Sequence, residues 1–296
     1  MHTVRIIPRL DVKGPNLVKG IHLEGLRVLG KPEDFALRYY SEGADELIYI
    51  DTVASLYGRS NLLDIVSKAA ERIFIPLTAG GGVRTLDDIR ELLRAGADKV
   101  AINTEAVHNP GFISVASRTF GSQCIVISIQ AKMRQPGTYE ALTDNAREKT
   151  GKDVFDWARE AVALGAGEIL LTSVDREGTG KGYDLELIKK ISRAVNVPVI
   201  ASGGAGNCAH FLDAVEIGAA DAISAASIFH YHCLRALSSS ETFKEEGNIE
   251  FIKMNRGGTE FLKGRIEPTD IPTLKDYLFR AGVSCRLTRE CNVGTA

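Results

Sequence analysis

Two residues near the ends of apolar runs have side chains that could take part in chemistry. Asp11 lies at the end of the run Val4–Val12, and Gln130 holds the equivalent place in the run Cys124–Ala131, 119 residues later. A carboxylate at the end of a strand can act as a general acid or base. An amide donates and accepts hydrogen bonds but does not exchange a proton near neutral pH. Capping a loop is the structural alternative for Asp11, and we favour catalysis because barrel enzymes place their chemistry at this end of a strand.

Two glycine-rich turns could bind phosphate groups. Gly80–Gly82 follows one apolar run and Gly203-Gly204 follows another, and each precedes a helical pattern. Glycine lets backbone N–H groups approach an anion closely, and the start of a helix adds partial positive charge. The next strands end in Asn103-Thr104 and Ala226-Ser227, which are small or polar. The presence of two such turns predicts a substrate with a phosphate at each end. The alternative is that both are tight turns with a structural role only.

Charged residues begin four of the apolar runs, at the end opposite the glycine turns. By alternation all four could face inward, two positive and two negative. Charges inside a barrel are costly unless they are paired. They therefore predict either a structural ring of ion pairs that closes this end of the barrel or a polar gate. The residues are Arg5, Glu46, Lys99 and Glu168.

The chain contains an internal repeat. Pro76–Gly82 resembles Pro198–Gly204 with a spacing of 122 residues, and the same spacing separates Gly43 from Gly165. A nearly constant offset across several anchor points indicates a duplicated βαβα half.

Short apolar runs alternate with amphipathic segments along the chain, which predicts a parallel sheet. Eight such units close as a (β/α)8 TIM barrel built from two duplicated (βα)4 halves. A doubly wound open sheet is the alternative, but it predicts one glycine-rich crevice rather than two. The predicted strands are Val4–Val12, Glu46–Asp51, Phe74–Ala79, Lys99–Asn103, Cys124–Ala131, Glu168–Val174, Val197–Ala201 and Ala222–Ala226.

We expect a single barrel domain over residues 1–287, with an insertion on its outside at about 238–270 and a flexible tail at 288–296. The polar segment Met133–Thr150 is expected to be an active-site loop that could form a hairpin. A net charge of −2 gives no reason to expect binding to nucleic acid or a membrane. The five cysteines are scattered, which favours free thiols in the cytoplasm and no metal site.

Six segments of the chain form long, specific motifs, namely Arg5–Lys13, Ala79–Gly82, Gly96–Thr104, Phe120–Gln123, Gly165–Ser173 and Ile200–Gly206. With them the chain resembles a known family, the cyclase subunit of imidazole glycerol phosphate synthase, over roughly residues 4 to 235 and again in the final helix. The resemblance implies the duplicated barrel and an ammonia-dependent lyase of histidine biosynthesis. It implies that ammonia cleaves a phosphoribulosyl-formimino aminoimidazole carboxamide ribotide to imidazole glycerol phosphate and an aminoimidazole carboxamide ribotide.

The resemblance also implies a partner and a set of site residues. A separate glutaminase subunit would dock at the N-terminal mouth of the barrel, and its ammonia would pass the gate of Arg5, Glu46, Lys99 and Glu168. No metal or organic cofactor is implied. Asp11 would be one of two catalytic aspartates. The residues expected to contact phosphate or substrate are Lys19, Gly82, Asn103, Thr104, Gly178, Gly204, Ala226 and Ser227.

Three features depart from the family pattern. Gln130 stands where the second catalytic aspartate is expected, Arg9 stands where the family usually has a small residue, and residues 238–270 are inserted. General acid–base catalysis contributes about 10²–10⁴-fold, so the loss of one partner predicts slower cyclisation. A cation two residues from Asp11 on the same face favours its carboxylate form and makes it a weaker acid.

These departures leave other functions open. A divergent paralogue could channel ammonia to an amidotransferase that modifies a cell-surface sugar, as in O-antigen or lipopolysaccharide amidation. The sibling isomerase of the histidine pathway would suffer equally from Gln130 and would need no ammonia gate. A barrel that only binds a phosphorylated ligand is the third alternative.

Overall fold

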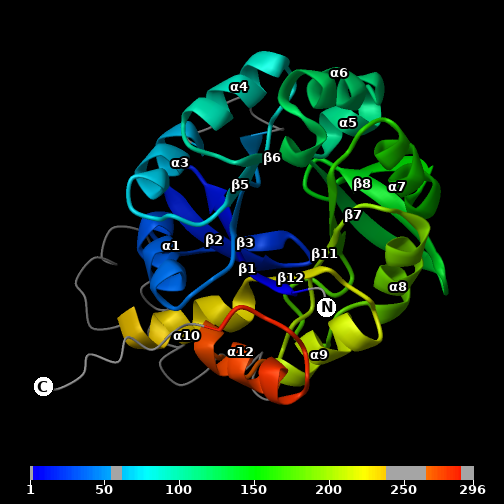
Figure 1. Cartoon of the computed structure of the whole chain (residues 1–296). Helices are drawn as coiled ribbons and strands as arrows, with labels where there is room; N and C mark the ends of the chain where they lie inside the picture. Colours follow the sequence, from blue (N-terminus) through cyan, green and yellow to red (C-terminus); the bar gives the residue numbers. More distant parts are fainter. Residues whose placement is uncertain (1–2, 55–61, 238–264, 288–296) are drawn as a thin grey trace, which may run out of the picture.

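The computed structural model describes residues 3–54, 62–237 and 265–287. Eight parallel strands close into a barrel, because the path from β10 through β12 and β1 to β7 returns by a pairing of β7 with β10. Helices surround this ring (Figure 1). The barrel strands are β1 (Arg5–Lys13), β4 (Leu47–Asp51), β5 (Leu77–Gly80), β6 (Lys99–Ile102), β7 (Ile125–Gln135), β10 (Glu168–Ser173), β11 (Val199–Ser202) and β12 (Ala222–Ala225). The TIM-barrel prediction is confirmed.

The helices pack one apolar face on the barrel. In α4, a capping box with Thr85 and Asp88 satisfies the first turn, and Ile89 and Leu92 are the buried residues. Most of the buried apolar side chains form one cluster that contains residues from both the helices and the strands. Among the described residues the helices are α1 (Pro32–Ser41), α3 (Leu62–Ala70), α4 (Leu86–Arg94), α5 (Thr104–His108), α6 (Gly111–Phe120), α7 (Val154–Ala163), α8 (Leu185–Ala194), α9 (Cys208–Glu216), α10 (Ser227–Leu237) and α12 (Ile271–Arg280), with a short 3₁₀ turn η1 (Ser122–Cys124).

Two antiparallel extensions rise from the barrel, one in each half. Strands β2 (Asn16–Ile21) and β3 (Glu24–Gly30) continue from β1, and β8 (Thr138–Thr143) and β9 (Glu148–Asp153) continue from β7. The segment Met133–Thr150 therefore forms a hairpin, as the sequence suggested. The extension after β1 was not anticipated, and it places Lys19 in strand β2 rather than in a loop.

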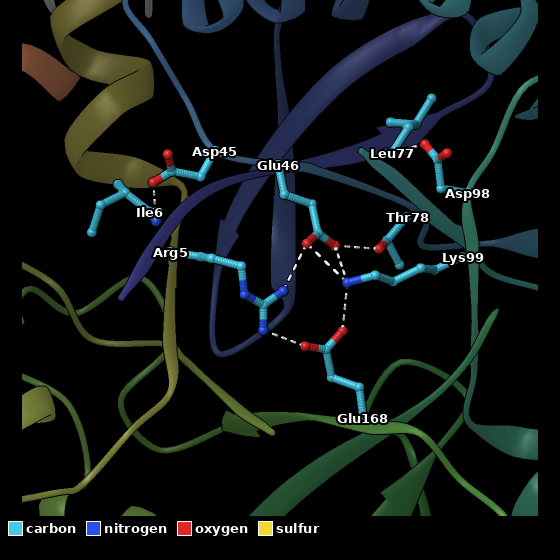
Figure 2. A network of polar contacts seen from close by, with 9 residues as sticks. All are labelled: Arg5, Ile6, Asp45, Glu46, Leu77, Thr78, Asp98, Lys99 and Glu168. Carbon is cyan, nitrogen blue, oxygen red and sulfur yellow. Dashed lines mark hydrogen bonds and ion pairs between the residues drawn. The ribbon is translucent and has the colours of Figure 1, made fainter. Parts of the chain in front are cut away.

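The duplication is visible in a repeated aspartate clamp at the start of the strands. Asp45 donates its backbone N–H to the Ile6 carbonyl and accepts the Ile6 N–H at 2.8 Å. Asp98 forms the same pair of bonds with Leu77 (Figure 2), and Asp221 forms it with Val199. Gly167 holds the fourth equivalent place, where a Cβ would collide with the Ser122 carbonyl oxygen.

The predicted insertion lies largely outside the described residues. Its described end, residues 265–270, packs against the loops that follow β10 and β11. Glu267 donates its N–H to the Gly206 carbonyl at 2.7 Å, and the Arg265 carbonyl lies beside Gly180. The predicted tail at 288–296 also falls outside the described residues. Within the described ranges, no helix is long and apolar enough to span a membrane.

The aspartate clamps predict two different losses of stability. Asp45→Ala also removes the ion-pair partner of Lys275, whose side chain is only 1% exposed, so the free energy of unfolding should fall by about 3 kcal/mol or more. Asp98→Ala removes only the bond to the Leu77 N–H and should cost about 1 kcal/mol. Urea denaturation of both variants measures the difference, and equal losses would show that Lys275 does not depend on Asp45.

Candidate active site

A ring of four charged side chains closes the N-terminal end of the barrel (Figure 2). The Arg5 guanidinium contacts Glu46 at 2.8 Å and also contacts Glu168, and the Lys99 ammonium bridges the same two carboxylates at 2.9 and 2.8 Å. The Thr78 hydroxyl donates to Glu46 at 2.6 Å. Burial lowers the pKa of Arg5, but Glu168 and Glu46 outweigh that effect and raise it above its usual value. The structure thus brings together all four residues proposed for the gate.

An apolar layer lies above this ring inside the barrel. Alternation along β1 puts Arg5, Ile7, Arg9 and Asp11 on one face, and Ile7 belongs to a buried cluster separate from the outer core. At about 3.3 Å per residue, Asp11 stands roughly 20 Å along the strand from Arg5. This apolar layer reaches from Ala222, which pairs with Arg5, to Ile50, which pairs with Asp11. Its residues are Ile7, Ile48, Ile50, Ala101, Val126, Leu170, Ile200 and Ala222.

Asp11 lies buried beside Arg9 above the apolar layer. The Arg9 Nε donates to the Asp11 carboxylate at 2.8 Å, and both side chains are 3% exposed. A second nitrogen of Arg9 donates to the Thr172 hydroxyl at 3.0 Å. Burial lowers the pKa of Arg9, while the charges of Asp11 and then Glu177 raise it above its usual value. The guanidinium therefore stays charged and remains the ion-pair partner of Asp11.

Lys19 forms the second buried ion pair at this end of the barrel. Its ammonium contacts the carboxylate of Glu177, and both side chains are almost fully buried. Burial lowers the pKa of Lys19, but Glu177 and Asp11 raise it above the usual value. Burial raises the pKa of Glu177, but Lys19 and Arg9 lower it below the usual value. Both groups therefore remain charged in the folded protein.

The first glycine turn opens into a cavity of about 280 Å³ that also contains Gln130. Gly81 and Gly82 have φ angles of +109° and +73°, which place them in the region that favours glycine. The Thr104 hydroxyl faces Asp144 at 3.3 Å and accepts its backbone N–H at 3.2 Å. The Asn103 amide donates to the carbonyls of Ser128 and Leu142, so its side chain braces the cavity wall.

Gln130 and Asn145 both line this cavity, and each has one amide atom bonded to the backbone. The Gln130 amide oxygen accepts the Ala146 N–H at 2.6 Å, so its NH₂ group takes no part in that bond. The Asn145 amide donates to the Leu23 carbonyl at 3.1 Å, and its Oδ1 is buried without a partner among the described residues. Residues 144–146 all have positive φ angles, a strained turn that holds Asn145 in this place.

The second glycine turn is almost closed. Gly203 and Gly204 have φ angles of +92° and +113°, and the cavity beside them measures only about 10 Å³. Arg9 and Glu177 line it together with the predicted phosphate residues Gly178, Gly204, Ala226 and Ser227. The structure therefore gathers the residues predicted for the second phosphate, but side chains of the protein fill the space between them.

Sequence reasoning missed three residues that shape these cavities, namely Glu177, Asp144 and Asn145. Glu177 directly precedes Gly178, which was proposed to contact phosphate, so its position beside a phosphate-binding turn could have drawn attention. Its partner Lys19 lies 158 residues away, and only the folded chain shows that they meet.

Comparison with known proteins identifies the family. The histidine biosynthesis protein family matches residues 5–235, a range that includes every site residue described above. A relative from Legionella pneumophila, "Imidazole glycerol phosphate synthase subunit HisF", is 63% identical over 211 residues, which cover 71% of this chain and all of the relative. The chain belongs to the HisF family, the cyclase subunits of imidazole glycerol phosphate synthase. A HisF relative from Alkaliphilus metalliredigens (strain QYMF) is 53% identical over 232 residues, which cover 78% of this chain and 92% of the relative.

The open cavity predicts that Gly82 is needed for phosphate binding. In Gly82→Ala the new Cβ would lie 2.7 Å from the Ala54 Cβ, so the turn must shift and its N–H groups should no longer meet the anion. Gly25→Ala is the matched control, because Gly25 has a similar φ of +60° but nothing within 4 Å of its Cβ position. Titration with inorganic phosphate, followed by ³¹P NMR, should show weaker binding only in Gly82→Ala. Equal binding by the two variants would contradict the assignment.

Proposed function

We propose that this chain is the ammonia-dependent cyclase subunit of imidazole glycerol phosphate synthase, a lyase. It would convert the phosphoribulosyl-formimino aminoimidazole carboxamide ribotide to imidazole glycerol phosphate and an aminoimidazole carboxamide ribotide. The observation that carries the proposal is the stacking of three layers along one barrel axis in a HisF-family chain. A charged ring lies at the floor, an apolar layer lies above it, and Asp11 lies near the other end of β1 from Arg5.

The three layers suit the passage of ammonia. Each cation in the floor ring contacts both carboxylates, so movement of one side chain could open the ring while the other contacts remain. Transfer of an unpaired ion into an apolar environment is strongly unfavourable, whereas a small neutral molecule pays no such electrostatic cost. The apolar layer would therefore admit ammonia and exclude ammonium, other solvated ions and the phosphorylated substrate.

In this proposal the catalytic groups have unequal roles. Asp11, held in place by its ion pair with Arg9, accepts protons as ammonia forms its bonds to the substrate. Gln130 orients the substrate by donating a hydrogen bond from its NH₂ group, but it cannot exchange protons. The proton transfer that a second carboxylate would perform is left to water or to the substrate itself, so turnover should be slow.

A glutaminase subunit is the proposed source of ammonia, and the N-terminal face is its proposed docking surface. The floor ring opens on this face, where the Arg5 and Lys99 side chains are 26% and 20% exposed. Phe74, three residues before β5, is 79% exposed and contacts the edge of the Tyr40 ring. A large exposed aromatic beside a polar opening is typical of a residue that anchors a protein partner.

The amidation of a cell-surface sugar is not favoured by any observation. Both relatives carry the name of the synthase subunit, and no feature of the described residues points to a sugar-modifying partner. We propose that the chain acts in the cytoplasm, where a biosynthetic enzyme of this kind would meet its phosphorylated substrate.

The unequal roles predict a gain of activity. Gln130→Asp should raise the turnover of the ribotide with ammonium salt by about tenfold or more, because it restores a proton-exchanging group at a site where such groups contribute about 10²–10⁴-fold. Asp11→Asn should remove most activity, and Ser114→Ala, on the outer helix α6, serves as a control. Product is measured by the loss of ribotide absorbance. Undetectable turnover in both the parent chain and Gln130→Asp would count against a cyclase.

The docking surface predicts a separation of two activities. Phe74→Asp should weaken glutaminase binding by about tenfold or more and reduce glutamine-driven turnover, as expected for an anchoring aromatic. It should leave ammonium-driven turnover unchanged, because Phe74 lies away from the catalytic rim. Met133→Asp, on the exposed part of β7 beyond that rim, is the control for binding. Unaltered glutaminase affinity in Phe74→Asp would place the docking surface elsewhere.

A further inference from the structure

Four charged side chains are buried together at the catalytic rim, namely Arg9, Asp11, Lys19 and Glu177. Each is at most 4% exposed, and they form two ion pairs, one of Arg9 with Asp11 and one of Lys19 with Glu177. Buried pairs of this kind are weak evidence for stability, because the loss of hydration offsets much of their attraction. The presence of two adjacent pairs at a ligand site therefore calls for a functional explanation.

Glu177 occupies the place where an anion would meet the second glycine turn. One of its carboxylate oxygens lies 3.1 Å from the Cβ position of Gly203, and the other contacts the Lys19 ammonium. Its side chain lines the small cavity beside Gly204 and Ser227. The first turn, by contrast, faces the open cavity of about 280 Å³.

Backbone contacts hold the β2–β3 hairpin against the barrel beside Glu177. The His22 N–H donates to the Glu177 carbonyl at 2.9 Å, and the His22 ring contacts the Val174 carbonyl at 2.8 Å. A Cβ at Gly178 would lie 2.6 Å from the Gly20 carbonyl, so the two backbones touch. These contacts do not involve the Glu177 carboxylate, so an anion that enters the second turn can displace this side chain while the hairpin keeps Lys19 in place.

We propose that Glu177 is a built-in competitor for the second phosphate of the substrate, and that Arg9 and Lys19 become ligands of that phosphate when it displaces the carboxylate. The inference rests on the proposed function for the identity of the substrate, but not for the chemistry of the site. The carboxylate and the phosphate are both anions that suit an ammonium, a guanidinium and a glycine turn. The exchange leaves both cations paired and releases only the Glu177 side chain.

The direct test removes the charge of Glu177 and keeps its size. In Glu177→Gln, binding of inorganic phosphate at the second turn should become about tenfold tighter or more, because a like charge no longer faces the anion. ³¹P NMR titration should then detect a second bound phosphate. Asp175→Asn is the matched control, because Asp175 loses the same charge two residues away but contacts Lys132 and the Met133 N–H instead. Its phosphate binding should equal that of the parent chain.

The role of Arg9 is tested in the same background. Arg9→Gln combined with Glu177→Gln should lose the gain in phosphate affinity. If the gain persists without Arg9, then Arg9 is not a phosphate ligand. If Glu177→Gln folds but binds phosphate no more tightly than the parent chain, the competitor role is wrong.

Glu177→Gln leaves Lys19 without its ion-pair partner and could destabilise the fold, so a second variant that keeps an ion pair is needed. Lys19→Glu combined with Glu177→Lys keeps the ion pair but places an ammonium beside Gly203, so phosphate should again bind more tightly than in the parent chain. Failure of both the exchanged pair and Glu177→Gln to gain affinity would overturn the proposal. The binding assay needs neither ammonia nor a glutaminase, so its result is independent of whether the chain turns over the ribotide.

Discussion

The structure depends on the pairing of charges inside a closed barrel. Unpaired ions in such an interior would be strongly destabilising, so each buried charge must meet its opposite. At the floor, Arg5 and Lys99 meet Glu46 and Glu168, and at the rim Arg9 and Lys19 meet Asp11 and Glu177. Apolar side chains such as Ile7, which lies between Arg5 and Arg9 on one face of β1, lie between the two sets. The two ends of the barrel thus carry complete sets of ion pairs.

The duplicated halves supply equivalent backbones, but they do not supply equivalent sites. The aspartate clamps at Asp45, Asp98 and Asp221 and the hairpins after β1 and β7 show how far the two halves still agree. The two glycine turns share their positive φ angles, yet one faces open space and the other faces Glu177. The repeat therefore determines where an anion could bind, while individual side chains determine whether the place is free.

The barrel could be predicted from the sequence because it rests on short-range patterns. Alternation along the strands correctly put Arg5, Glu46, Lys99 and Glu168 at one end, and the spacing of the repeat gave both glycine turns. The sequence could not reveal that Lys19 lies in a strand and contacts Glu177, because that contact joins residues 158 positions apart through a hairpin. The sequence also could not show that the Asn103 amide donates hydrogen bonds to the backbone carbonyls of Ser128 and Leu142, because such bonds depend on three-dimensional placement.

The four buried charges at the rim leave neither of their two cations free. Arg9 is paired with Asp11 and Lys19 with Glu177, so the four charges sum to zero. Gln130 is only 6% exposed, and its neutral amide accepts the Ala146 N–H. Thr172 neighbours both departures from the family pattern, because it pairs with Gln130 along the sheet and accepts a hydrogen bond from Arg9. An amide at position 130 adds no charge to a rim whose ion pairs are already complete, whereas a buried carboxylate there would need donors of its own.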